Sequence, residues 1–122
     1  MRILIADDNH SVRQGVRRIL SSQSNHEVCG EAGDGAEALR MAHTLLPDLV
    51  LLDVSMPEPG GLETARLLRR ELPQIKVVIM RQHDPSFLSP RVIEVGAQGC
   101  IDKNRLDSDL VATIGKIKET HA

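Results

Sequence analysis

The sequence of 122 residues predicts an α/β fold, a doubly wound (βα)5 three-layer sandwich built on a parallel sheet with strand order 2-1-3-4-5. Two observations predict this fold. Short apolar runs alternate along the chain with segments whose apolar residues recur at helical spacing, which is the pattern of βαβ units. The run 49–52 is apolar throughout and lies between Pro47 and Pro57, as expected of an interior strand that is buried on both faces.

The first half of the chain is predicted to form two strands and two helices. Residues 3–6 form the first strand and residues 28–32 the second. Asp34, followed three residues later by Glu37, gives the second helix a capping-box start, and Pro47 ends it. The apolar faces of the two helices consist of Val12, Val16, Ile19 and Leu20, and of Leu39, Ala42, Leu45 and Leu46.

The second half continues the alternation, with strands predicted over 49–53, 75–80 and 100–102. A third helix stops before Pro73, because the residue that precedes a proline disfavours the helical region. The apolar faces of the third and last helices consist of Leu62, Ala65, Leu68 and Leu72, and of Leu106, Leu110, Ile114 and Ile117.

The segment after the fourth strand is predicted from its prolines. Pro90 would lie inside a helix that began at Pro85, and a proline in a helix interior costs about 3 kcal/mol. Ser89 and Pro90 are instead a good N-cap and first helical residue. We therefore expect a loop over 82–88 and a short fourth helix over 90–95.

Composition excludes several function classes. Fifteen Lys and Arg stand against seventeen Asp and Glu, for a net charge of −2 with no block of like charge, so no surface for nucleic acid or anionic membrane is expected. Phe87 is the only aromatic residue, which leaves no stacking platform for single-stranded nucleic acid. Cys29 and Cys100 lack metal or redox spacing and are expected to be buried free thiols. No secretion signal or membrane-spanning run occurs, so we expect a cytoplasmic protein of one domain, residues 1–122.

Charged residues follow four of the five predicted strands. Asp7 and Asp8 end the first strand, Asp53 ends the third, Arg81 follows the fourth and Lys103 follows the fifth. In the flavodoxin-like strand order the first and third strands are neighbours at the switch point, where ligands bind beyond the carboxyl ends. Three carboxylates in one crevice repel one another and need a cation. Oxygen ligands at octahedral geometry favour Mg²⁺.

Each of these residues also has an ordinary structural explanation. Paired Asp residues after a strand are more often turn formers or helix caps than ligands. Lys103 alone is typical of a solvated surface lysine. Independent turn residues, however, need not place three acids and a lysine on a single crevice.

Three motifs together resemble the receiver domain of two-component response regulators over the whole chain. They are residues 3–8 (ILIADD), residues 51–57 (LLDVSMP) with Gly61, and residues 96–103 (GAQGCIDK). The segment 34–39 (DGAEAL) and residues 83–85 (HDP) resemble most the NarL/FixJ, or LuxR-type, transcriptional regulators.

That resemblance implies a role for each residue of the crevice. Asp53 would be the phosphoacceptor, and Asp8, Asp53 and the backbone carbonyl of Ser55 would coordinate Mg²⁺, with Asp7 supporting the metal through water. Lys103 would pair with Asp53 and then with a phosphoryl oxygen. Chemistry agrees with these roles, since a carboxylate is ionised at neutral pH and phosphoryl transfer needs positioning and charge neutralisation. The protein would assist only its own phosphorylation and dephosphorylation, and is not expected to be an enzyme acting on other substrates.

Two positions depart from the family pattern. Arg81 stands where receivers usually have Ser or Thr, and Cys100 stands where they usually have an aromatic residue, so both partners of the usual switch are missing. An inward Arg81 would reduce the crevice charge from −2 (three acids, one lysine) to −1, weaken Mg²⁺ binding and hold one conformer. The alternative is that its long stem carries the guanidinium into solvent. Ser55 and His83 occupy positions that resemble those tuning autodephosphorylation, although a loop histidine is more often plain surface.

Three functions remain open at this stage. The first is a phosphoacceptor switch that serves a transcriptional regulator, and the second is a receiver-like interaction module that works without phosphorylation. The third is an aspartyl-phosphate phosphatase, which needs a second acid as general acid/base two residues after the nucleophile. This chain has Ser55 at that position. Flavin or dinucleotide binding is disfavoured because Gly30, Gly33 and Gly35 lack the required spacing.

The resemblance also implies partners. A sensor histidine kinase would supply the phosphoryl group. A homodimer would use the fourth helix, fifth strand and last helix (90–95, 100–102 and from 106), or the first and last helices. DNA would be contacted only through a helix-turn-helix domain that these residues lack, and no membrane contact is expected.

Overall fold

A five-stranded parallel sheet forms the centre of the protein, as predicted, in the order β2-β1-β3-β4-β5. The computed structural model describes residues 1–23, 25–56, 60–81 and 96–121. The strands are β1 (Arg2–Ala6), β2 (Glu27–Ala32), β3 (Leu49–Asp53), β4 (Lys76–Arg81) and β5 (Gly99–Asp102). The described helices are α1 (His10–Ser21), α2 (Gly35–Leu45), α3 (Gly61–Glu71) and α5 (Leu106–His121). A short 3₁₀ turn, η1 (Lys103–Arg105), leads from β5 into α5. The fourth helix predicted over 90–95 and the loop before it lie outside the described residues.

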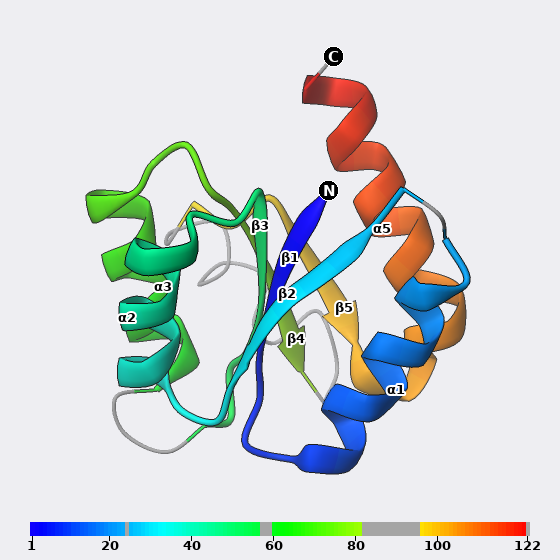
Figure 1. Cartoon of the computed structure of the whole chain (residues 1–122), viewed down its shortest axis with the longest axis horizontal. Helices are drawn as coiled ribbons and strands as arrows, with labels where there is room; N and C mark the ends of the chain where they lie inside the picture. The colour runs from blue at the N-terminus through cyan, green and yellow to red at the C-terminus, as the bar shows by residue number, and fades with distance from the viewer. Residues whose placement is uncertain (24, 57–59, 82–95, 122) are drawn as a thin grey trace.

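Helices cover both faces of the sheet, which gives the predicted three layers. In Figure 1, α2 and α3 lie on one face and α1 and α5 on the other. Each face has its own apolar cluster: Leu4, Val50 and Ile79 point toward α2 and α3, whereas residues such as Ile5, Leu51 and Ile101 point toward α1 and α5. All five residues of β3 are buried, which confirms that the apolar run 49–52 is the central strand. The topology therefore brings the carboxyl ends of β1 and β3 side by side.

Local sequence signals account for where the second helix begins and ends. Asp34 Oδ1 accepts a hydrogen bond from the Glu37 amide at 2.8 Å, so the predicted cap is confirmed. The helix ends at Leu45, and Leu46 closes it in the left-handed region with φ of 49°. The fourth strand differs slightly from its prediction, because Arg81 is its last residue and does not follow it. The ladder continues to this point since Arg81 lies opposite Asp102 of β5.

The two cysteines are free thiols, but the prediction that both are buried is wrong. Cys29 and Cys100 are each partly exposed. The reason is their place in the sheet, since β2 and β5 are its two edge strands. No helix within the described residues is long and apolar enough to cross a membrane.

Candidate functional site

Asp53 is the last residue of the central strand and is completely buried. The backbone that follows Asp53 is held against β4 by a hydrogen bond from the Val54 amide to the Met80 carbonyl, at 3.0 Å. One carboxylate oxygen, Oδ1, accepts hydrogen bonds from the Ser55 amide at 3.0 Å and from the Ser55 hydroxyl at 2.8 Å. The carboxylate is therefore oriented by the turn that follows its own strand.

Lys103 joins the carboxylates of Asp7 and Asp53. Its Nζ lies 2.7 Å from Asp7 Oδ2 and 3.0 Å from Asp53 Oδ2. Both aspartate side chains are fully buried, and that of Lys103 is only 10% exposed. Three segments far apart in the sequence thus meet at the carboxyl edge of the sheet, as the strand order predicts.

Burial and charge act against each other in this cluster. Burial raises the pKa of Asp7, and the nearby charge of Asp53 raises it further, while hydrogen bonds from Lys103 and the Asn9 amide work in the opposite direction. Burial alone would lower the pKa of Lys103, but its contacts with Asp7 and Asp53 outweigh burial and leave that pKa raised. Lys103 is therefore held as an ammonium by its two carboxylate partners, and burial makes the ionised form of Asp7 less favourable than it is in water.

Asp8 completes a group of three acids that fits a hard cation. Carboxylate oxygens of Asp7, Asp8 and Asp53 lie within 4.8 Å of one another. Asp8 differs from the other two because it is exposed, and no described residue donates a hydrogen bond to its carboxylate. Two buried carboxylates and one exposed carboxylate, with a single lysine to balance them, are the oxygen donors that Mg²⁺ prefers. The residues present therefore fit a magnesium ion at this position.

The start of α3 packs directly on the turn that follows Asp53. A Cβ placed on Gly61 would lie 2.1 Å from the backbone oxygen of Asp53 and 2.6 Å from Val54 Cα. No side chain fits there, so the close approach requires glycine. Gly61 thereby fixes how near the helix stands to the Asp53 backbone.

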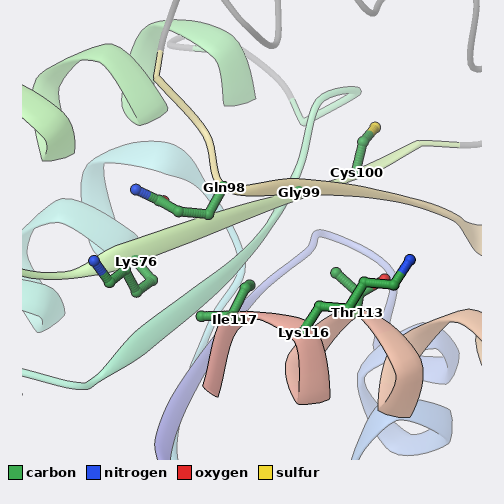
Figure 2. Close-up of a pocket in the computed structure, with 7 residues that line it drawn as sticks. All are labelled: Lys76, Gln98, Gly99, Cys100, Thr113, Lys116 and Ile117. Carbon is green, nitrogen blue, oxygen red and sulfur yellow. The ribbon is translucent and has the colours of Figure 1, made fainter. Parts of the chain in front are cut away.

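The two atypical residues lie on neighbouring strands on the other side of this edge. Arg81 is only 3% exposed, so in this structure its side chain turns inward and does not extend into solvent. Cys100, on β5, packs against the apolar cluster under α2 and α3, and Figure 2 shows it pointing away from α5 and its residues Thr113, Lys116 and Ile117. Burial raises the pKa of the Cys100 thiol, and the charge of Arg81 lowers it in part. Arg81 and Cys100 are therefore electrostatic neighbours.

The structure brings together most of the residues that the sequence singles out. Asp7, Asp8, Asp53 and Lys103 form one cluster, and Ser55 contacts Asp53. His83 lies outside the described residues.

Sequence reasoning missed three supporting residues of this edge. They are Asn9, which caps α1 and donates its amide to Asp7 Oδ1 at 2.8 Å, and the pair Arg13 and Glu31. Asn9 had a usable signal, since Asn is a preferred N-cap before an apolar helical repeat. The pair Arg13 and Glu31 had none, because it depends on how α1 docks on β2.

Comparison with known proteins gives the class that this fold and site define. Residues 3–115 match the family described as response regulator receiver domain. Response regulator UvrY of Escherichia coli (strain K12) is 34% identical over 117 residues, which cover 96% of this chain and 54% of UvrY. Response regulator GacA of Pseudomonas viridiflava is 39% identical over 114 residues, which cover 93% of this chain and 53% of GacA.

Solved structures give the same class. A two-component response regulator of the LuxR family from Aurantimonas sp. SI85-9A1 superimposes with a TM-score of 0.89 at 34% identity, covering 95% of this chain and 83% of that one. The signal receiver domain of the putative response regulator NarL from Mycobacterium tuberculosis gives 0.89 at 31% identity, covering 97% and 95%.

The chain belongs to the response regulator receiver family. Within that family it is similar to the LuxR-type regulators, as the segment 34–39 and residues 83–85 predict. It spans about half the length of the curated relatives it matches.

Proposed function

We propose that this chain is a phosphoacceptor switch that takes a phosphoryl group on Asp53. The observation that carries the proposal is the contact of Lys103 Nζ with Asp53 Oδ2 at 3.0 Å and with Asp7 Oδ2 at 2.7 Å, inside a cluster of three acids. The donor is the phosphohistidine of a sensor histidine kinase or a small phosphodonor. One oxygen of Asp53 attacks phosphorus, and the bond from phosphorus to the leaving atom breaks, with its electron pair remaining on the imidazole nitrogen of phosphohistidine or on the oxygen of the small donor.

The protein's own residues prepare Asp53 for this step. Ser55 holds one carboxylate oxygen through its amide and hydroxyl, and Lys103 holds the other. The attacking group is thus oriented before the donor arrives, and orientation is a large part of what phosphoryl transfer needs. As charge moves onto the phosphoryl oxygens, the Lys103 ammonium is placed to follow it.

A magnesium ion would be held by Asp8, Asp53 and the backbone carbonyl of Ser55, with Asp7 supporting it through water. When bound, Mg²⁺ neutralises charge on the phosphoryl oxygens and on the crowded carboxylates. The fit rests on the three acids, whose three negative charges are offset only in part by the single positive charge of Lys103.

Phosphorylation would be read out by an atypical switch. Arg81 is buried at the position where relatives in the family usually have a small hydroxyl residue, and Cys100 stands in place of an aromatic ring. A phosphoryl group adds about −1.5 to −2 charge, which a buried guanidinium can meet without the movement that a short hydroxyl side chain must make. We infer that Arg81 holds this side of the sheet near one conformer in both states.

The same observation favours a second function, a receiver-like interaction module that works without phosphorylation. Arg81 is buried at the end of β4, the strand that pairs with β3, and a fixed guanidinium there would lock the switch whether or not Asp53 is modified. In either case the partner surfaces would be α5 with β5, for dimers or for an output domain. DNA would be contacted by a domain beyond residues 1–122, and the protein would act in the cytoplasm.

The test separates the two functions. The chain is incubated with Mg²⁺ and acetyl phosphate, and intact mass is recorded for the parent, Asp53→Asn and Asp48→Asn. Asp48 precedes the other end of the same strand, where Oδ2 accepts the Arg2 amide at 2.7 Å, so its variant is a matched control. We expect one phosphoryl adduct on the parent and on Asp48→Asn and none on Asp53→Asn. No adduct on the parent would favour the phosphorylation-independent module.

A further inference from the structure

Arg13 on α1 holds the backbone of the loop that carries the two acids. Its Nη1 donates a hydrogen bond to the Asp7 carbonyl at 2.5 Å, and its Nε donates to Glu31 Oε1 of β2 at 2.9 Å. The preceding peptide is fixed as well, since the Asp7 amide donates to the Ala32 carbonyl at 3.0 Å. Both peptide planes that flank Asp7 are therefore held, one by β2 and the other by Arg13.

Glu31 orients Arg13 for this contact. The carboxylate lies on β2, in register with Ile5 of β1, and accepts hydrogen bonds from Arg13 on one oxygen and from Arg17 on the other. The hydrogen bond from Arg17, and then that from Arg13, lower the pKa of Glu31, so it stays ionised at neutral pH. The side chains of Arg13 and Glu31 are 18% and 25% exposed, which shields the pair from much of the solvent screening that weakens surface ion pairs.

Asp8 depends on this backbone more than its neighbours do. Asp7 and Asp53 have their carboxylates fixed by hydrogen bonds and by Lys103, whereas no described residue donates to the Asp8 carboxylate. The direction of the Asp8 side chain is therefore set by the peptide that joins it to Asp7, whose carbonyl is the one that Arg13 holds.

We propose that Arg13, oriented by Glu31, is a positioning residue that aims Asp8 at the divalent cation. This inference rests on the proposed function, because it assigns a support to the metal site of that function. Mg²⁺ demands near-ideal octahedral geometry, so a small rotation of the Asp7–Asp8 peptide removes a ligand from its place. Residues that orient metal ligands typically change metal affinity by 10- to 100-fold when they are lost.

The sign of the effect distinguishes positioning from charge. Arg13 is a cation close to a cation site, so an effect of its charge alone would make Mg²⁺ bind more tightly once the guanidinium is removed. Positioning predicts the reverse, weaker binding after removal. The two explanations therefore cannot give the same result.

The experiment compares Arg13→Gln with Arg17→Gln in the full chain. Each variant removes one of the two guanidinium groups that donate hydrogen bonds to Glu31. Only Arg13→Gln also removes a hydrogen bond to the Asp7 carbonyl. The Mg²⁺ dissociation constant is measured by titration calorimetry, and the rate of phosphorylation by acetyl phosphate is measured across Mg²⁺ concentrations. We expect Arg13→Gln to weaken Mg²⁺ binding about 10-fold and to recover the parent rate at saturating Mg²⁺, with Arg17→Gln unchanged.

Two further variants keep the result decisive. Arg13→Lys, which can reach only one of the two acceptors, should lie between the parent and Arg13→Gln. Glu31→Gln leaves the guanidinium of Arg13 but removes its charged partner, so we expect it to weaken Mg²⁺ binding as well. It therefore provides the test if Arg13→Gln fails to fold. Unchanged or tighter binding in folded Arg13→Gln, or equal losses in Arg13→Gln and Arg17→Gln, would overturn this inference alone. A parent chain that binds no Mg²⁺ would overturn it together with the proposed function.

Discussion

The carboxyl edge of the sheet has two halves that differ in how closely they follow the family pattern. In the β1 and β3 half, Asp7, Asp8 and Asp53 meet Lys103 in one ion cluster. In the β4 and β5 half stand Arg81 and Cys100, where the resemblance to the receiver family leads us to expect a hydroxyl residue and an aromatic residue. If the proposed function holds, the groups that carry out phosphoryl transfer and the relay that reports it are separate parts of this edge, which can change independently.

The largest expected effect comes from a substitution that disrupts the ion cluster of the β1 and β3 half. In Lys103→Met, the buried carboxylates of Asp7 and Asp53 lose the cation between them, and a transferring phosphoryl group loses its ammonium. We expect the rate of phosphorylation to fall about 100-fold, as for the loss of other preorganised donors. Intact mass over time measures the rate. The control is Lys76→Met, at the first residue of β4 and so at the opposite, amino end of the strands, which should keep the parent rate. If Lys103→Met were phosphorylated as fast as Lys76→Met, the role of Lys103 would be contradicted.

A second prediction concerns the backbone of the same half. Gly61→Ala places a Cβ 2.1 Å from the Asp53 backbone oxygen, so α3 must move away from the turn that follows Asp53. We expect the free energy of unfolding to fall by about 3 kcal/mol, at the upper end of overpacking costs. Gly115→Ala is the matched control, because nothing lies within 4 Å of its added Cβ inside α5, and alanine should stabilise that helix by roughly 0.5–1 kcal/mol. Denaturant unfolding followed by circular dichroism gives both values, and equal effects would refute the close approach.

The third prediction follows from the buried charge of Asp7. Its raised pKa means that the folded protein holds the Asp7 proton more tightly than the unfolded chain does. This contribution to stability is present below the unfolded pKa and is lost as pH rises through the raised folded pKa, so ionised Asp7 destabilises the protein at pH 7.

Asp7→Asn should therefore raise the free energy of unfolding at pH 7, without Mg²⁺, by about 1 kcal/mol. Lys103 keeps its contact with Asp53 in this variant. Urea titrations between roughly pH 4 and pH 8 should show the gain growing as pH rises. A gain that is absent, or that shrinks with rising pH, would show that the Lys103 contact outweighs burial.

The smallest effect belongs to the second half of the edge. Arg81→Thr removes a buried positive charge from the carboxyl end of β4 and introduces the residue type that the resemblance to the receiver family leads us to expect there. We expect Mg²⁺ to bind about 3-fold more tightly, because a screened positive charge at the same edge of the sheet no longer repels the cation. Calorimetric titration of the variant beside Lys76→Met, which removes a distant lysine, separates this local effect from net charge. Equal affinities in parent and Arg81→Thr would mean that the guanidinium does not act on the crevice.

Sequence patterns predicted the central features of the fold and the acidic cluster for physical reasons. The uninterrupted run 49–52 can only be buried on both faces, so β3 had to be interior, and parallel strands bring their carboxyl ends to one edge. Asp7, Asp53 and Lys103 therefore meet whatever the loops do. Arg81 was placed one residue wrongly because the end of a strand is set by its neighbour, here the pairing with Asp102.

What the sequence could not predict depends on tertiary docking. Arg13 and Glu31 meet only because α1 packs on the face of the sheet over β1 and β2, in a position that no periodicity specifies. The exposure of Cys29 follows from the position of β2 at the edge of the sheet and not from its local sequence. Whether Arg81 turned inward was likewise undecidable, because a long stem fits either environment.

We propose that the chemistry at Asp53 is intact while the relay through Arg81 and Cys100 is altered. The most direct measurement is the change in backbone amide NMR shifts of the parent chain when beryllofluoride, a mimic of the phosphoryl group, is added with Mg²⁺. We predict large changes at residues 7–9, 53–55 and 103 and only small ones over 99–102 and α5. Changes of equal size over 99–102 would contradict the altered relay, and the absence of change at 53–55 would contradict the phosphoacceptor itself.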